Sequence, residues 1–340
     1  MQTRRAVVLF NLGGPDSLAA VEPFLCNLFS DPDIFKIPLG WLLQKPLARW
    51  IAHRRAPEAA EGYRAIGGRS PLLENTLAQA EALQQALNAQ AEVRVAAGTT
   101  RRTALAPDAI DVFVCMRYWH PRATEVVARL KAGGYDDIVL LPLYPQYSLT
   151  TTGSSYNEFM RACQAAAYTP SVRLVRDWYQ QPDYQRAIVE TMQQALREFP
   201  DPDPAHVECL FSAHGLPQKF VRAGDPYERQ IQATYEAVRA QLGWPHTTLC
   251  YQSRVGPLEW LRPYTDDVIR AKAAAGTKQM LVYPIAFVSD HIETLFELGI
   301  TYAKLARELG VAHYRVVPAL NTHPRLISVL RDLTLGQTTS

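Results

Sequence analysis

The segment that decides the fold is AVVLFNLGGP (residues 6–15), an aliphatic run that ends in two glycines and a proline. A short apolar run bounded by turn residues predicts a buried β-strand. The segment VECLFSAHGLP (residues 207–217) repeats this pattern with a histidine before the glycine. A second pair also matches, because IVLLPLYPQYS (residues 138–148) and MLVYPIAFVSD (residues 280–290) both run into proline and then aromatic and hydroxyl residues. The two pairs predict two similar halves, with chance likeness between short apolar strands as the alternative.

The rest of the chain alternates between short β-branched runs and segments of helical periodicity. Further strands are predicted at residues 93–97, 172–175, 248–251 and 314–317, and helices at residues 76–87, 123–132, 184–198, 227–242 and 301–309. This alternation predicts parallel sheets with helices on both faces. We expect an α/β fold of two Rossmann-like, doubly wound halves, residues 1–180 and 181–325, followed by a C-terminal helix and tail at 326–340. The matching strand ends would then surround a shared cleft, where such sheets bind ligands.

Composition narrows the class of protein. The 340 residues are 48% hydrophobic and 20% charged, and the formal net charge of +2 lacks the basic excess of a nucleic-acid binder. The five cysteines are widely spaced without a C-x-x-C pair, which argues against a disulfide framework or a thiolate zinc site. The N-terminal apolar run is too short for a signal peptide, and no apolar stretch is long enough to span a membrane. We therefore expect a globular protein of a reducing compartment, with no more than peripheral membrane contact.

His214 is the first candidate for chemistry, because it follows a predicted strand and stands directly before Gly215. A loop at a strand end holds an imidazole at the edge of the sheet. With an ordinary pKa of about 6.5, an imidazole accepts a proton near neutral pH, and its neutral form binds metals. The alternative for a single histidine at a turn is a hydrogen-bonded structural role, and only its partners distinguish the two.

An acidic row in SDHIETLFELG is the second candidate. Asp290, Glu293 and Glu297 are spaced i, i+3 and i+7, which places them on one face of a helix. Carboxylates in such a row repel one another, take up protons more readily and attract divalent cations. A helix-capping pair of Asp290 and Glu293 is the alternative, but it leaves Glu297 and the neighbouring His291 unexplained. The row therefore suits proton removal and metal entry.

Several other segments suit a flat, anionic ligand. Arginines and clustered hydroxyl groups bind carboxylates, and Tyr and Trp rings form apolar walls. These features occur in RYWHPR (residues 117–122), YPQYSLTTTGSSYNEF (residues 144–159), YRAIGGRSP (residues 63–71) and the pair Arg54 and Arg55. The glycine pair after the first strand lacks the G-x-G-x-x-G pattern, so we do not expect a dinucleotide site.

The segment IFKIPLGWLLQKPLARWIAHRRAP (residues 34–57) mixes large apolar residues with prolines and basic residues. One interpretation is an interfacial lip whose Trp41, Leu42, Leu43 and Trp50 enter a bilayer while Arg54 and Arg55 meet lipid headgroups. The other is a helix hairpin that packs into the core.

Along almost its whole length the sequence resembles the ferrochelatases. The motifs that carry the resemblance are NLGGP (residues 11–15), FLCNLFSDPDI (24–34), YRAIGGRSP (63–71), RYWHP (117–121), YPQYSLTTTGSS (144–155), FSAHGLP (211–217), GDPY (224–227), YQSRVGPLEWLRPYTDD (251–267) and PIAFVSDHIETLFELGI (284–300). So many motifs in the same order make the resemblance specific. It implies a chelatase-like fold around a porphyrin cleft and the insertion of Fe2+ into protoporphyrin IX to form protoheme, the last step of heme biosynthesis, with release of two protons.

The resemblance also implies roles for individual residues. His214 matches the family's active-site histidine and Glu293 the carboxylate opposite it, and both are expected to be catalytic and to contact the metal. We expect His214 to take protons, while Glu293 with Asp290, His291 and Glu297 delivers metal or releases protons. The residues expected to bind the porphyrin are Leu12, Arg54, Arg55, Arg117, Tyr118, Tyr144, Ser148 and Phe287.

No permanently bound cofactor is expected, because Fe2+ is a substrate. Animal ferrochelatases bind a [2Fe–2S] cluster through cysteines of a C-terminal extension and one cysteine in the segment that matches YPQYS. This chain has Leu149 at that interior position and ends soon after its last predicted helix, so an iron–sulfur cluster is not expected.

The apolar segment at residues 34–57 resembles that of membrane-associated members, which favours protoporphyrin as the substrate. We therefore expect a cytoplasmic enzyme, peripheral on the inner face of the cell membrane, without a nucleic-acid partner. The alternatives are a coproporphyrin or cobalt chelatase and a non-catalytic porphyrin- or metal-binding protein. The sequence does not indicate an oligomeric state.

Overall fold

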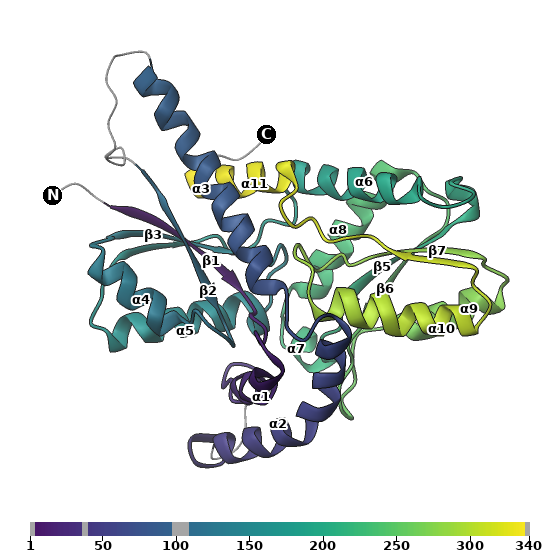
Figure 1. Cartoon of the computed structure of the whole chain (residues 1–340), viewed down its shortest axis with the longest axis horizontal. Coiled ribbons are helices and arrows are strands. Elements are labelled where there is room, and N and C mark those ends of the chain that lie inside the picture. The colour runs from purple at the N-terminus through teal and green to yellow at the C-terminus, as the bar shows by residue number, and fades with distance from the viewer. Residues whose placement is uncertain (1–3, 36–39, 97–108, 337–340) are drawn as a thin grey trace.

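The computed structural model describes residues 4–35, 40–96 and 109–336. Two parallel sheets lie side by side in Figure 1. The strands of the first sheet, in the order β2-β1-β3-β4, are β1 (Arg5–Asn11), β2 (Asp111–Met116), β3 (Asp137–Pro142) and β4 (Ser171–Leu174). Those of the second, in the order β6-β5-β7-β8, are β5 (Glu208–His214), β6 (Thr247–Gln252), β7 (Gln279–Tyr283) and β8 (His313–Val316). The two orders are equivalent, which confirms the predicted α/β fold and the matching of β1 with β5 and of β3 with β7.

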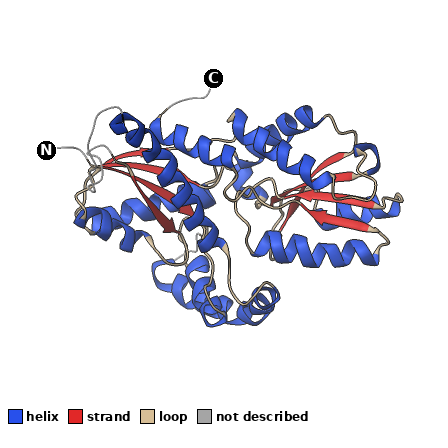
Figure 2. Cartoon of the chain, turned by 45° about the horizontal axis from the view of Figure 1, so that its top comes forward, coloured by secondary structure: helices blue, strands red, loops and turns tan. Residues whose placement is uncertain are grey.

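Helices cover both faces of each sheet (Figure 2). On the first sheet, α4 (Ala123–Ala132) and α5 (Ser154–Ala165) pack on one face, and α3 (Leu72–Ala96) with α11 (Pro324–Leu335) on the other. On the second sheet, α9 (Thr265–Ala274) and α10 (Ala303–Glu308) pack on one face, and α6 (Pro182–Leu196) with α8 (Tyr227–Leu242) on the other. Such two-sided burial explains why the central strands are almost entirely apolar: Val7, Val8 and Leu9 of β1 are fully buried.

The first half differs from the prediction at one element. Residues 93–96, which were expected to begin a strand, continue α3 to its end at Ala96, and residue 97 lies outside the described residues. Helix α3 contains no glycine or proline that would end it earlier. Once a helix has formed, each further residue that joins it adds a backbone hydrogen bond. The strand that pairs with β1 at this edge of the sheet is instead β2, with the sequence DVFVCM, which was not predicted.

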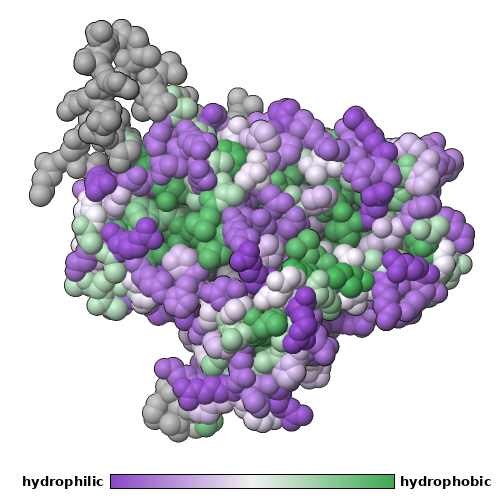
Figure 3. Space-filling model, viewed as in Figure 1, coloured by the Kyte–Doolittle hydropathy of each residue, from purple (hydrophilic) through white to green (hydrophobic). Residues whose placement is uncertain are grey.

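Two helices project from the first half below its sheet (Figure 1). Helix α1 (Val21–Phe29) packs along α2 (Gly40–Ala65), with the small residues Ala48 and Ala52 of α2 buried. Leu43, Leu47 and Trp50 are exposed, and their spacing of i, i+4 and i+7 places them on one side of the helix. Figure 3 shows the surface of this projection as a mixture of hydrophilic and hydrophobic residues. Residues 40–57 therefore form part of one helix with an exposed apolar side and not a helix hairpin in the core. The side chains of Trp41 and Leu42 lie outside the described residues.

Helix α11 joins the two halves. It follows the second sheet in the chain, yet it packs against α3 of the first half and against α6. Arg173 of β4 donates from Nη2 to the carbonyl oxygens of Leu333 (3.0 Å) and Thr334 (2.5 Å). One continuous apolar cluster accordingly runs through both halves, and the division near residue 180 stays a prediction.

The shorter elements complete the chain. They are η1 (Leu18–Ala20), η3 (Pro204–His206), α7 (Gln218–Arg222) and the π-helical segments η2 (Leu149–Gly153) and η4 (Glu293–Tyr302). The acidic row was expected on an ordinary helix, but Glu293 and Glu297 belong to η4, in which hydrogen bonds reach from i to i+5. The wider turn brings residues four apart close to the same side.

Candidate functional site

A cavity of about 750 Å³ lies between the two halves. The carboxyl ends of β1, β3, β5 and β7 each contribute to its wall, through Leu12, Tyr144, His214 and Phe287 respectively. This is the position expected for a ligand site in parallel sheets. The volume falls within the range of small-molecule sites, and most of the lining is apolar. The cavity is therefore suited to a large, flat, apolar ligand.

His214 is the last residue of β5, and its side chain is 39% exposed. Its Nδ1 lies 2.5 Å from the carbonyl oxygen of Gly215. A carbonyl only accepts hydrogen bonds, so we assign the proton of the neutral ring to Nδ1. The lone pair then resides on Nε2, which faces Glu293 at 3.8 Å from Oε2. His214 is thus prepared to accept a proton or bind a metal through Nε2.

The residue after His214 must be small. The Gly215 N–H donates to the carbonyl oxygen of Gln252 at 2.8 Å. A Cβ atom at position 215 would lie 2.9 Å from that oxygen and 3.1 Å from the Trp260 ring. Glycine therefore allows the end of β5 to approach β6 closely.

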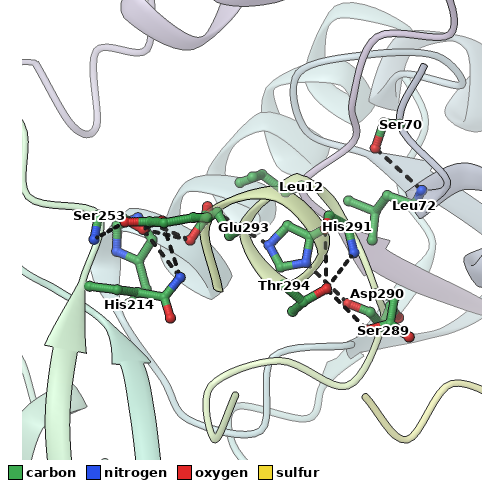
Figure 4. A network of polar contacts seen from close by, with 12 residues as sticks. Leu12, Ser70, Leu72, His214, Ser253, Ser289, Asp290, His291, Glu293 and Thr294 are labelled. Carbon is green, nitrogen blue, oxygen red and sulfur yellow. Dashed lines mark hydrogen bonds and ion pairs between the residues drawn. The ribbon is translucent and has the colours of Figure 1, made fainter. Parts of the chain in front are cut away.

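Glu293 begins η4 and lies between the rings of His214 and His291 (Figure 4). Its Oε1 is 3.8 Å from Nε2 of His291, and its Oε2 is the atom that faces His214. Burial opposes the charge of Glu293, but the positive charge of protonated His214 and of His291, together with the Ser253 hydroxyl, outweighs it and lowers the pKa of Glu293 to about 2. Glu293 is thus an ionised carboxylate between two histidines.

Glu297 lies near Glu293 on η4 and has a different environment. Burial, and then the negative charge of Glu293, raise the pKa of Glu297 above its ordinary value. Its Oε1 accepts hydrogen bonds from the backbone N–H of Ser253 (2.9 Å) and the hydroxyl of Tyr302 (3.1 Å). The two carboxylates therefore differ in proton affinity.

Asp290 makes hydrogen bonds within the protein and does not face the cavity. Its Oδ1 accepts from the hydroxyl of Thr294 (3.0 Å) and its Oδ2 from the side-chain amide of Asn321 (2.8 Å). It does not line the cavity, and the helical segment at Ile292 and Glu293 begins without a side-chain cap. The capping interpretation of Asp290 and Glu293 is therefore wrong. Asp290 instead ties the start of η4 to the loop after β8.

The residues expected to bind the porphyrin divide into two groups. Those that line the cavity are Leu12, Arg55, Tyr118, Tyr144, Ser148 and Phe287, as do His214, His291, Glu293 and Glu297. Arg54 and Arg117 do not line it. The Arg54 guanidinium lies 5.2 Å from the centre of the Trp50 ring on the outer side of α2.

Arg117 belongs to a buried network behind the cavity wall. Its Nη2 lies 2.9 Å from Oδ2 of Asp31, and the same oxygen accepts from the hydroxyls of Tyr118 (2.6 Å) and Ser154 (2.5 Å). The side chains of Arg117 and Asp31 are only 5% and 0% exposed. The network holds the Tyr118 ring in the cavity wall. Arg117 therefore supports the wall from behind, through Asp31 and Tyr118, and does not face the cavity itself.

Sequence reasoning missed several residues of the site. Tyr63 lies in the wall, where burial and then the charge of Glu293 raise its pKa. Lys219 and Arg254 also line the cavity. Ser253 contacts both Glu293 and Glu297. All four lie in or beside segments noted in the sequence, but the residue types alone give no indication of which side chains face inward.

Comparisons with known proteins agree with this geometry. The family model described as ferrochelatase matches residues 4–338. A ferrochelatase of Nostoc sp. is 45% identical over 336 residues, which is 98% of this chain and 82% of the relative. A ferrochelatase of Synechocystis sp. is 44% identical over 340 residues, again 98% of this chain and 82% of the relative.

Two solved structures share the fold at low sequence identity. SirB from Bacillus subtilis, solved with Fe3+, is 8% identical with a TM-score of 0.53, over 99% of this chain and 96% of that one. A multi-domain protein from Deinococcus radiodurans with structural similarity to chelatases is 14% identical with a TM-score of 0.51, over 99% of this chain and 55% of that one.

Proposed function

The chain belongs to the ferrochelatase family, and from this premise we propose that it inserts Fe2+ into protoporphyrin IX to form protoheme, with His214 taking protons and Glu293 handling the metal. The observation that carries this division is the facing pair itself. Nε2 of His214 and Oε2 of Glu293 lie 3.8 Å apart in the wall of the cavity.

The reaction requires two proton transfers and four metal–nitrogen bonds. A free-base porphyrin has two pyrrole N–H groups, and each N–H bond breaks with its electron pair left on nitrogen. Nε2 of His214 is the acceptor that the tautomer leaves free. Fe2+ exchanges its water ligands for the four nitrogens, so the heme is neutral at its centre and two protons leave.

The ionised carboxylate of Glu293 supports both steps. It stabilises the imidazolium that forms when His214 accepts a proton, and an oxygen ligand of this kind binds Fe2+ while the metal loses water. His291 and Glu297 extend this polar side of the cavity, and the apolar walls face the macrocycle. Asp290 contributes by fixing the start of η4.

The direct test is anaerobic incubation of the purified protein with protoporphyrin IX and Fe2+, followed by the visible spectrum. We expect the free-base bands to be replaced by heme bands at a rate proportional to enzyme. Parallel reactions with coproporphyrin and with Co2+ identify the preferred pair of substrates. Tight porphyrin binding without metalation by any of these pairs would identify a binding protein.

The His214→Ala variant tests the assigned base. We expect it to keep its fold and its affinity for porphyrin but to lose metalation by at least about 100-fold, the usual contribution of a positioned base. His246→Ala is the matched control, because His246 is an exposed histidine of the same half outside the cavity. Metalation by His214→Ala at the wild-type rate would show that another group takes the protons.

We also propose that the enzyme acts in the cytoplasm, at the membrane surface, without a resident cofactor. Leu43, Leu47 and Trp50 on α2 offer an apolar side beside Arg54, as an interfacial helix requires. Among the described residues no helix has the length and hydropathy to cross a bilayer.

The proposed lack of an iron–sulfur cluster is supported by the cysteines. All five belong to different elements, and Leu149 occupies the position noted for a cluster ligand.

A further inference from the structure

Ser253 follows β6 and has a backbone conformation that serine rarely adopts. Its φ is +63°, in the left-handed region that favours glycine. From this position its backbone N–H donates to Oε1 of Glu297 at 2.9 Å, and its hydroxyl contacts Oε2 of Glu297 and, at 3.1 Å, Oε2 of Glu293. Figure 4 shows Ser253 beside Glu293 at the His214 end of the site. The unusual backbone thus directs two polar groups of one residue toward two carboxylates.

These contacts act on two groups that repel each other. Glu293 and Glu297 lie near one another on η4, and the charge of each opposes the charge of the other. Glu297 has further partners outside the pair, since Gln252 and Tyr302 both donate to it. On Glu293, the oxygen that contacts Ser253 is the one that faces His214. Ser253 therefore contacts Glu293 at the oxygen that faces the histidine.

We propose that Ser253 is a positioning residue for metal delivery, which holds Glu293 and Glu297 side by side and keeps Oε2 of Glu293 directed at His214. The proposal rests on the proposed function and adds to it a determinant of Fe2+ handling outside the acidic row. A divalent cation prefers several oxygen ligands at fixed spacing, and two carboxylates that share a hydroxyl partner provide such a spacing.

The proposal predicts that Ser253 affects the use of Fe2+ but not the binding of porphyrin. The apolar walls suited to the porphyrin come from both halves, whereas the hydroxyl of Ser253 contacts the two carboxylates on the polar side of the cavity. Loss of the hydroxyl is therefore expected to impair the use of Fe2+ and to leave porphyrin affinity unchanged. A structural role for Ser253 would lower stability and the handling of both substrates together.

The experiment compares Ser253→Gly and Ser253→Ala with the wild type. Glycine removes the hydroxyl and relieves the positive φ, whereas alanine removes the hydroxyl and keeps the constraint. The readouts are kcat/KM for Fe2+ under anaerobic conditions, porphyrin affinity from fluorescence quenching, and the midpoint of thermal unfolding. Ser171→Ala, at an exposed serine that begins β4, is the control.

We expect kcat/KM for Fe2+ to fall about 10- to 100-fold in both the glycine and alanine variants, the size typical of a hydrogen bond to a charged group. Porphyrin affinity should stay within about twofold in both variants. Wild-type use of Fe2+ by Ser253→Gly, or an equal loss of porphyrin affinity, would overturn the proposal. A wild-type protein that does not metalate porphyrin would instead contradict the proposed function.

Discussion

At the scale of single residues, the buried Oδ2 atom of Asp31 has three polar partners. It accepts hydrogen bonds from Tyr118 and Ser154 and pairs with Arg117, all in the protein interior. A buried charge that loses its partner costs far more than the intact pair contributes. Loss of the Asp31 charge is therefore expected to destabilise the first half.

We predict that Asp31→Asn lowers the free energy of unfolding by about 3 kcal/mol, because it removes the closer counter-charge of the buried Arg117 guanidinium and leaves only Glu158, whose Oε2 is 3.9 Å from Nη1. Urea unfolding followed by far-ultraviolet circular dichroism measures this loss. Asp16→Asn, an exposed aspartate of the same half, is the control and should change stability by less than about 0.5 kcal/mol. A loss of under about 1 kcal/mol in Asp31→Asn would show that the network is dispensable.

Glu293→Gln keeps the size of the side chain and removes its charge, so we predict a loss of metalation of at least about 100-fold. The lowered pKa of Glu293 also links it to stability. Because the folded pKa of about 2 lies below the ordinary value of 4.5, the ionised group stabilises the protein above pH 4.5, and this contribution disappears as the pH falls toward 2. At pH 5 the variant should be less stable than the wild type by up to about 3 kcal/mol.

Urea unfolding at pH 5 and at pH 3.5 measures this linkage. The difference between wild type and Glu293→Gln should narrow at the lower pH. A difference that is the same at both values would mean that the charge of Glu293 is not stabilised in the folded protein.

The sequence pointed to His214, Glu293 and Glu297 of the cavity wall, whose chemistry shows in the adjacent chain, and missed residues defined by distant contacts. His214 interrupts an apolar strand just before glycine, and the acidic row repeats within one segment. Asp31 acquires its role from Tyr118, 87 positions away, and Ser253 from Glu297, 44 positions away. Arg117 resembles a ligand-binding arginine in sequence because its buried partner is equally remote.

At the scale of elements, α2 combines two surfaces. Ala48 and Ala52 allow close packing against α1, while Leu43, Leu47 and Trp50 remain exposed. Because the buried residues of α2 are small and its exposed residues are large and apolar, its sequence lacks a clear amphipathic pattern. The sequence alone therefore did not distinguish an interfacial lip from a helix hairpin. The π-helical form of η4 also has no sequence signal, because the residue spacing fits an ordinary helix equally well.

Replacing Leu43, Leu47 and Trp50 together with serine should weaken binding to anionic liposomes by at least about 10-fold, since each large side chain contributes apolar area to the interface. Co-sedimentation with vesicles measures this binding. The thermal midpoint should be unchanged, because these side chains are already exposed. As a control, Leu77→Ser removes an exposed leucine from α3 and should not affect sedimentation. Equal binding by the triple variant and the wild type would contradict a membrane role for α2.

At the scale of the whole molecule, the core shields four of the five cysteines. Cys115, Cys163, Cys209 and Cys250 are buried, whereas Cys26 on α1 is half-buried. Burial raises the pKa of Cys115 and of Cys250 to about 12, so at pH 8 both are neutral thiols and poor nucleophiles. Reactivity toward thiol reagents is therefore expected at one position.

We predict that an aromatic disulfide reagent at pH 8 modifies one thiol of the native protein rapidly and all five after unfolding. The release of the coloured thiolate measures the number modified. Cys26→Ser should abolish the rapid phase. If this variant still reacts rapidly, one of the buried thiols becomes accessible in the native protein.

The packing of α11 has a consequence for the order in which the protein is completed. A ribosome makes residues 324–335 after the second sheet, but their buried side chains, including Leu326 and Leu330, belong to the apolar cluster that α3 shares. During translation this surface of the first half therefore stays uncovered until the second half has been synthesised. Nascent chains halted before residue 324 should bind chaperones through the first half, and release should follow once α11 emerges.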